Sequence, residues 1–269
     1  MRRFPVAWKA FRDARVTAFG GGGLAFGLGL LYVALFPSIQ ETLAGAQLPE
    51  WWQSFGGEAG YTTPAGYLSG EFFMAVPIIL VIFAVVNGTG ATAGEESAGT
   101  LELLLAQPVR RRRVVVEKAA GLGAALAVAM LLGGLGVYAG QALVEFELSP
   151  LRVAAALVLT VPVLWFFLAL ALLAGAALPG RAAAAAVSTL LAVAAYVLNT
   201  IANLVDWLRP WRKAQPFWWS DVSGVLSGDW GDAWQPLVLL AAAAVLFAGA
   251  VVMFERRDIG VGGGRRRRK

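Results

Sequence analysis

Six long apolar runs constrain the fold of this 269-residue chain more than any other feature of its sequence. A helix needs about 20 apolar residues to cross a hydrocarbon core of about 30 Å. Because the bilayer core offers no water to backbone polar groups, such runs cross it as helices. The runs lie near residues 17–36, 65–87, 115–139, 151–178, 182–205 and 234–254. The sequence therefore predicts an all-α membrane protein with six transmembrane helices.

Two local features predict how these helices connect and pack. Residues 178–181 leave room only for a tight turn between the fourth and fifth runs. Within the third run, Gly136 and Gly140 form a pair of small residues four positions apart, a spacing that permits close helix contact.

Composition excludes several functional classes. Hydrophobic residues make up 58% of the chain and charged residues only 14%, whereas a soluble domain carries about 25% charged residues. The chain has no Cys and no His, which removes thiolate and imidazole metal ligands, Cys nucleophiles and His general bases. None of the four lysines follows a glycine, so the chain lacks the Gly-Lys-Ser/Thr of a phosphate-binding loop. We therefore expect no enzymatic activity, no metal site and no cofactor on this chain.

The distribution of basic residues predicts the orientation. With both termini in the cytoplasm, 18 of the 22 Lys and Arg residues lie on the inner side, as the positive-inside rule requires. Because these charges sit at membrane edges, we expect no nucleic-acid partner. The basic tail, residues 255–269, is expected to contact lipid headgroups or to be disordered. The prediction is a multi-pass protein of the cell (plasma or inner) membrane.

Residues 1–16 have the pattern of an amphipathic helix. Pro5 suits the first turn of a helix, and Phe4, Trp8 and Phe11 share one face. We expect an elbow-like helix lying in the interface before the first span; a disordered basic leader is the alternative. The six-helix domain then covers residues 17–254.

Tryptophans predict the form of the outer segments. Eight of the ten tryptophans fall on the predicted outer side. Because tryptophan side chains prefer the depth of the lipid headgroups, we expect segments 40–63 and 206–233 to lie along the outer interface as short helices.

Between the second and third runs lies a charged stretch, residues 94–113, inside the predicted cytoplasmic loop 88–114. Thr100 suits a helix N-cap, Glu102 favours the positive end of the helix, and Pro108 ends it. One face of this short helix is apolar, formed by Leu101, Leu104 and Leu105. Nothing else in the cytoplasmic part of the chain is available to bury that face, so the helix is expected to bind a partner protein.

The stretch from Gly94 to Val109, with Lys118 downstream, closely resembles the intracellular-loop signature of type-2 ABC transporter permeases. Residues 48–68 and 254–259 are similar to the same family, so the resemblance covers essentially the whole chain. It implies that Thr100 to Ala106 form a coupling helix seated on an ATPase subunit. The residues it assigns to ATPase coupling are Gly94, Glu95, Glu96, Gly99, Thr100, Leu101, Glu102, Leu104, Leu105 and Pro108.

The resemblance also implies partners and a mechanism. The chain would be the permease of an ABC exporter, paired with a second permease copy in a homodimer or heterodimer. Two copies of a separate ATPase would bind ATP and Mg, and would power alternating access for a hydrophobic or amphipathic substrate leaving the cytoplasm or the inner leaflet. An ATPase-independent channel or secondary carrier, and a membrane anchor that transports nothing, are the alternatives.

A polar stripe follows the fifth run at helical spacing, formed by Thr189, Tyr196, Asn199 and Asn203, with Thr200 beside it. Such residues serve helix–helix hydrogen bonding, or they line a translocation path, since the resemblance implies that the second and fifth spans do so. Both interpretations stay open. The spans otherwise carry almost no charge, which argues against an ion-driven carrier and favours a weakly charged amphipathic substrate.

Overall fold

The computed structural model describes residues 5–43, 60–95, 110–202 and 205–256. All regular elements in these ranges are helices, and six of them are long and apolar enough to cross a membrane. The six spans are η1 with α2 (Val16–Gly21 and Gly22–Leu43), α4 with η3 (Pro64–Thr89 and Gly90–Gly94), α7 (Arg111–Gln141), α8 (Pro150–Ala177), α9 (Arg181–Ile201) and α11 (Pro236–Arg256). The predicted all-α membrane fold is confirmed.

Several spans end elsewhere than predicted, and the first continues to Leu43 rather than ending at 36. The second span continues through the π-helical η3 to Gly94, and the fifth ends at Ile201 rather than at 205. Before the first span, α1 (Pro5–Asp13) is separated from η1 by little more than a turn at Ala14. The tight turn between α8 and α9 is as predicted, and Gly180 adopts a φ of 82° there, which a side chain would strain.

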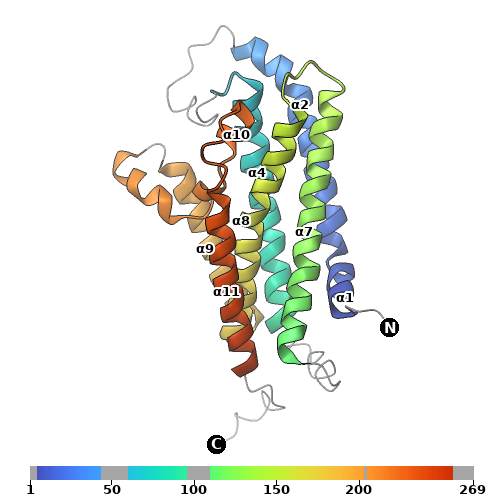
Figure 1. The fold of residues 1–269 in the computed structure, drawn as a ribbon, viewed down its shortest axis with the longest axis vertical. Coiled ribbons are helices and arrows are strands. Elements are labelled where there is room, and N and C mark those ends of the chain that lie inside the picture. Colours follow the sequence, from blue (N-terminus) through green and yellow to red (C-terminus); the bar gives the residue numbers. More distant parts are fainter. Residues whose placement is uncertain (1–4, 44–59, 96–109, 203–204, 257–269) are drawn as a thin grey trace, which may run out of the picture.

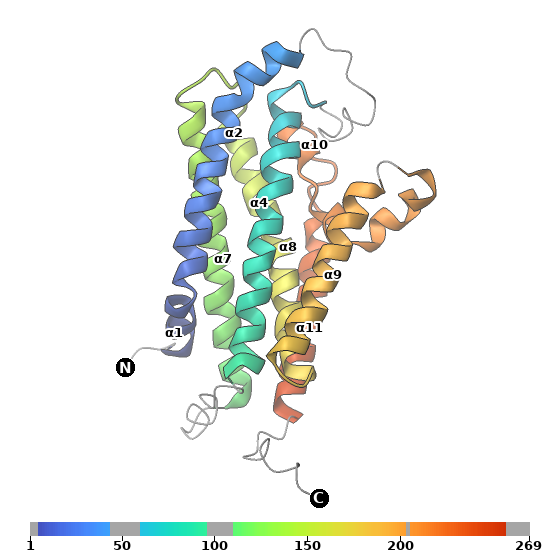
Figure 2. The ribbon, with the colours of Figure 1, turned by 180° about the vertical axis from the view of Figure 1, so that it is seen from behind.

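The helices form one upright bundle in which α1 and the last turn of α11 lie at the same end, here named the α1 end (Figure 1). In the most apolar stretch of α7 and of α8, 61% of the residues are buried, compared with 17% in α9 and 22% in α11. The central helices are therefore α7 and α8. On the other side of the bundle α2, α4 and α9 lie next to one another (Figure 2). Long faces of α9 and α11 are therefore open to lipid or to another chain.

Glycines set the contact between α2 and α7, the most extensive helix pair in the described bundle. A Cβ atom at Gly136 would overlap the carbonyl oxygen of Phe26 on α2. A Cβ at Gly140 would lie 2.7 Å from the side chain of Val33, which is too close for an undisturbed contact. The predicted close approach at Gly136 and Gly140 is therefore present, and it brings the two backbones together.

At the end opposite α1, residues 205–235 fold into the short helices η4 (Asp206–Ala214), η5 (Trp218–Ser220) and α10 (Ser223–Ser227). Arg152 at the start of α8 donates hydrogen bonds to the carbonyls of Leu226 and Ser227, at 3.5 and 3.2 Å. These contacts hold the end of α10 against the bundle. The short helices agree with the prediction for segment 206–233, whereas most of segment 40–63 lies outside the described residues.

Gly136→Ala should lower the free energy of unfolding by about 2 kcal/mol, because the new methyl group forces α2 away from α7. Gly27→Ala is the matched control on α2, since a Cβ at Gly27 would meet nothing within 4 Å. Thermal unfolding of the purified variants in the same detergent measures the difference. Equal melting temperatures for the two variants would contradict the packing described here.

Candidate functional site

The residues predicted to couple the chain to an ATPase begin at the α1 end of the bundle. Gly94 ends η3 and Glu95 follows it, while α7 begins at Arg111 on the other side of the loop. The other predicted coupling residues lie outside the described residues: Glu96, Gly99, Thr100, Leu101, Glu102, Leu104, Leu105 and Pro108. The coupling helix therefore stays a prediction, and the structure describes the two helices to which it is attached.

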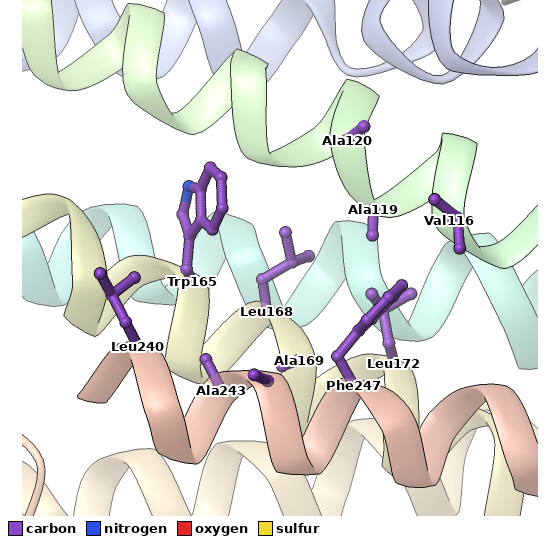
Figure 3. A pocket seen from close by; sticks show the side chains of 11 residues that line it. Val116, Ala119, Ala120, Trp165, Leu168, Ala169, Leu172, Leu240, Ala243 and Phe247 are labelled. Atoms are coloured by element: carbon purple, nitrogen blue, oxygen red, sulfur yellow. The ribbon is translucent and has the colours of Figure 1, made fainter. Parts of the chain in front are cut away.

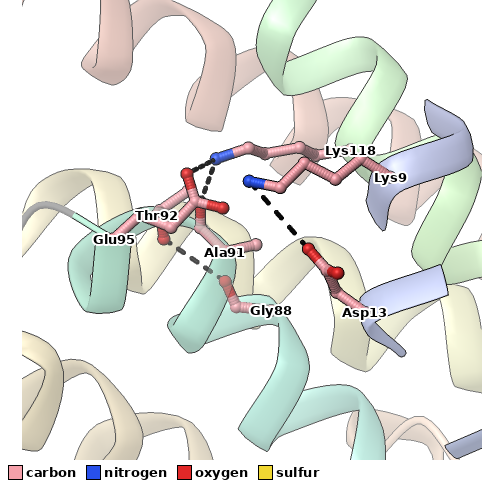
Figure 4. Close-up of polar contacts among 7 residues, drawn as sticks. All are labelled: Lys9, Asp13, Gly88, Ala91, Thr92, Glu95 and Lys118. Atoms are coloured by element: carbon pink, nitrogen blue, oxygen red, sulfur yellow. Dashed lines mark hydrogen bonds and ion pairs between the residues drawn. The ribbon is translucent and has the colours of Figure 1, made fainter. Parts of the chain in front are cut away.

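A buried ion pair joins these two helices. The Nζ atom of Lys118 on α7 lies 2.6 Å from Oε2 of Glu95 and also donates a 2.6 Å hydrogen bond to the carbonyl oxygen of Ala91 in η3 (Figure 4). The Lys118 side chain is 5% exposed and that of Glu95 is 24% exposed. An ammonium group this buried is costly without a partner. Lys118 therefore holds both η3 and Glu95, the residue just before loop 96–109, against α7.

The preceding residue, Glu117, holds a different element. Its Oε2 atom accepts hydrogen bonds from the backbone N–H groups of Val6 and Ala7, at 2.9 and 3.1 Å, and Arg113 donates a 2.6 Å bond to Oε1. The first turn of a helix has unpaired N–H groups and a positive dipole end. Glu117 therefore caps α1 from another helix. Gly121, one turn further along α7, lies so close to the Ala7 carbonyl that a side chain there would collide with it.

Adjacent residues of α7 thus grip α1 on one side and η3 on the other. We call this arrangement the α7 clamp: Glu117 and Lys118 together with their partners at the start of α1, in η3 and at Glu95, the residue after η3. Asn87 on α4 adds a further link, since its Nδ2 atom donates a 2.6 Å hydrogen bond to Oγ1 of Thr17 in η1. Sequence reasoning missed the role of Glu117: its i,i+4 spacing from Arg113 is visible in the sequence, but that spacing does not indicate a contact with α1, 111 residues away.

Two π-helical segments, η1 and η3, border the clamp. Such segments are rare and occur frequently at functional sites. The η3 segment also packs tightly on α8, because a Cβ at Gly175 would overlap the hydroxyl of Thr92. Motion of η3 would therefore reach α7 through Lys118 and α8 through this close contact.

A polar cavity of about 210 Å³ lies beside the clamp, between α1, α4, α7 and α9. Its charged and amide lining residues are Asp13, Asn87, Glu95, Lys118 and Arg181. A polar space of this size is suited to ordered water. The contacts of the clamp connect helices to one another. Within the described part of the chain, no group of metal-binding residues comes together.

The polar stripe of α9 lies towards the opposite end of the bundle. Asn199 accepts a 2.7 Å hydrogen bond from Gln215, and the Thr200 hydroxyl donates to the carbonyl of Tyr196 at 3.1 Å. The Tyr196 ring packs edge-to-face on Phe217. The Gln215 and Phe217 contacts tie α9 to the segment after η4, whereas the Thr200 bond stays within α9. Thr189 is exposed. Asn203 lies outside the described residues.

Removal of Glu95 should lower the free energy of unfolding more than removal of Lys118. Glu95→Gln leaves a buried ammonium without its counter-charge, so we expect a loss of about 3 kcal/mol. Lys118→Met leaves the more exposed carboxylate, which reaches water, and should cost less. Thermal unfolding of both single variants and the double variant tests this asymmetry. Strictly additive effects would contradict a direct ion pair.

Comparison with known proteins identifies the family. No curated protein matched the chain. The family described as the C-terminal domain of the multidrug efflux system permease Rv1217c matches residues 5–255, from the start of α1 to the last turn of α11. A match of this extent, together with six membrane-length helices, shows that the chain belongs to this family and is a multi-pass permease of an efflux system.

Proposed function

We propose that this permease is the membrane subunit of an ATP-driven ABC exporter, and that a separate ATPase supplies its energy. The α7 clamp is the observation that carries the proposal. One pair of adjacent residues connects α1 to η3, and η3 leads through Glu95 into residues 96–109, where the family resemblance implies an ATPase-binding helix.

The proposed mechanism follows the contacts outward from that helix. ATP binding and hydrolysis on two ATPase subunits, with Mg as their cofactor, would move residues 100–106. The Glu95–Lys118 pair would transmit this motion to α7, and the glycine-mediated contact would pass it to α2. A continuous series of packed contacts and hydrogen bonds of this kind can carry coupling between distant sites. The bundle would then alternate between inward-facing and outward-facing states.

The orientation and the assembly are part of the same proposal. The excess of Lys and Arg favours a cytoplasmic location for the α1 end, for both chain termini and for the loop between η3 and α7. Residues 1–16 would serve as the elbow helix, 17–254 as the transmembrane domain and 255–269 as a basic tail. Six spans form half of a transporter, so a second copy, identical or homologous, would complete the path. The weakly charged spans favour a hydrophobic or amphipathic substrate.

The replacement of Leu104 and Leu105 by Asp in one variant should abolish ATPase binding, because it places two charges on the face that the ATPase would bury. The expected result is loss of both co-purification with the ATPase subunits and substrate-stimulated ATP hydrolysis in vesicles. Lys9→Gln is the control at the same end of the bundle, since Lys9 is exposed and, within the described residues, forms a weak 4.0 Å surface pair with Asp13.

Three results would reject the proposal in different ways. If the double Asp variant folds normally and still stimulates the ATPase, residues 100–106 are not the contact. If the unmodified permease moves substrate in vesicles without any ATPase, it is a channel or a secondary carrier. If it binds the ATPase but substrate never changes ATP hydrolysis, it is an anchor.

A further inference from the structure

A lateral groove of about 340 Å³ runs between α7, α8 and α11 (Figure 3). All 11 residues that line it are apolar or aromatic. Val116 and Ala120 form one wall, Ala244 and Phe247 form the other, and Trp165 and Leu172 of α8 contribute to the floor. All three helices are long and apolar enough to span a membrane, so the groove faces the bilayer.

The groove exists because α11 packs along α8 and meets α7 closely only at the α1 end. There Val115, Ala176 and Phe254 form a small buried cluster. Away from this cluster α7 and α11 diverge (Figure 1). The walls between them carry alanines, which are too short to fill the space, and the Trp165 indole lies against Gly123.

The physical character of the groove limits what fills it. An apolar space gives water no hydrogen-bond partners, so water is excluded. Empty space is also unfavourable, because its lining atoms lose their van der Waals contacts. A neutral lipophilic compound gains no hydrophobic free energy by moving from lipid tails into an equally apolar groove. The acyl chain of a neighbouring lipid meets all of these conditions without leaving the bilayer.

Charge at the mouth of the groove selects the headgroup. Arg112, Val116 and Ala120 follow one another at i, i+4 and i+8 on α7, so they share one helix face. Arg112 is exposed and lies one turn below the groove, within a run of four arginines. A guanidinium in this position favours a phosphate, which it can bind with two parallel hydrogen bonds. At the end of α11, Glu255 and Arg256 add no net charge.

We propose that the groove binds one acyl chain of an anionic glycerophospholipid whose phosphate contacts Arg112. This inference rests on the membrane location of the groove and does not require an ATPase. It also bears on the α7 clamp, because Val116 and Ala119 flank Glu117 and Lys118 on the opposite face of the same helical turns. A bound lipid would therefore support the part of α7 that holds α1 and η3.

The test uses purified permease in nanodiscs that contain phosphatidylglycerol with a photoactivatable group in one acyl chain. Peptide mass spectrometry should find the label on residues of the groove, with a preference of about fivefold over the same probe with a phosphatidylcholine headgroup, as expected for one arginine at the surface. Ala120→Trp should abolish labelling by both probes. Arg112→Gln should remove only the preference.

Matched controls separate filling of the groove from damage to the fold. Val245→Trp places the same bulk on α11 at a side chain that is 72% exposed and does not line the groove, and Arg12→Gln removes an exposed charge from α1. Both should label like the unmodified chain. Ala244→Trp fills the groove from the other wall if Ala120→Trp does not fold.

Three results would overturn the proposal. One is undiminished labelling of the groove in well-folded Ala120→Trp and Ala244→Trp variants. Another is displacement of the label by a neutral aromatic compound, which would make the groove a drug site. The third is a disulfide between two Ala244→Cys copies, which would assign the groove to a second copy of the chain.

Discussion

The α1 end of this permease depends on the neutralisation of one buried ammonium group. The Lys118 side chain is 5% exposed, and it is stabilised there by the Glu95 carboxylate and the Ala91 carbonyl. That requirement fixes η3 to α7 at the point where the chain leaves the described bundle. Glu117 meets a second electrostatic requirement one residue earlier by capping α1. The elements nearest to the predicted ATPase-binding loop are therefore held by charged groups in addition to close packing.

The packing of the bundle explains why α7 is suited to this role. It is among the most buried of the six spans, and glycines on its surface let α2 and α1 approach its backbone. Displacement at its α1 end would therefore reach several helices at once. The peripheral helices α9 and α11 keep large open faces. These faces are available to lipid and to the second protomer of the proposed dimer.

Much of this fold follows from sequence, and the limits have a physical cause. Length and hydropathy predict all six spans, because crossing a bilayer sets a minimum apolar length. Gly136 and Gly140 predict a close helix contact without naming α2 as the partner. The cap on α1 could not be predicted, because Glu117 and Val6 are 111 residues apart and no local pattern joins them. The apolar groove between α7, α8 and α11 could not be predicted from the sequence either, because it depends on how α7 and α11 diverge in space.

The central claim is that energy from an ATPase enters the bundle through the Glu95–Lys118 pair. Substrate-dependent ATP hydrolysis in vesicles tests it most directly when the charges are exchanged. Glu95→Lys and Lys118→Glu should each uncouple hydrolysis from substrate, because each places two like charges in contact. The double exchange restores an opposite pair and should recover coupling. Full coupling in both single variants, or none in a well-folded double variant, would contradict the account.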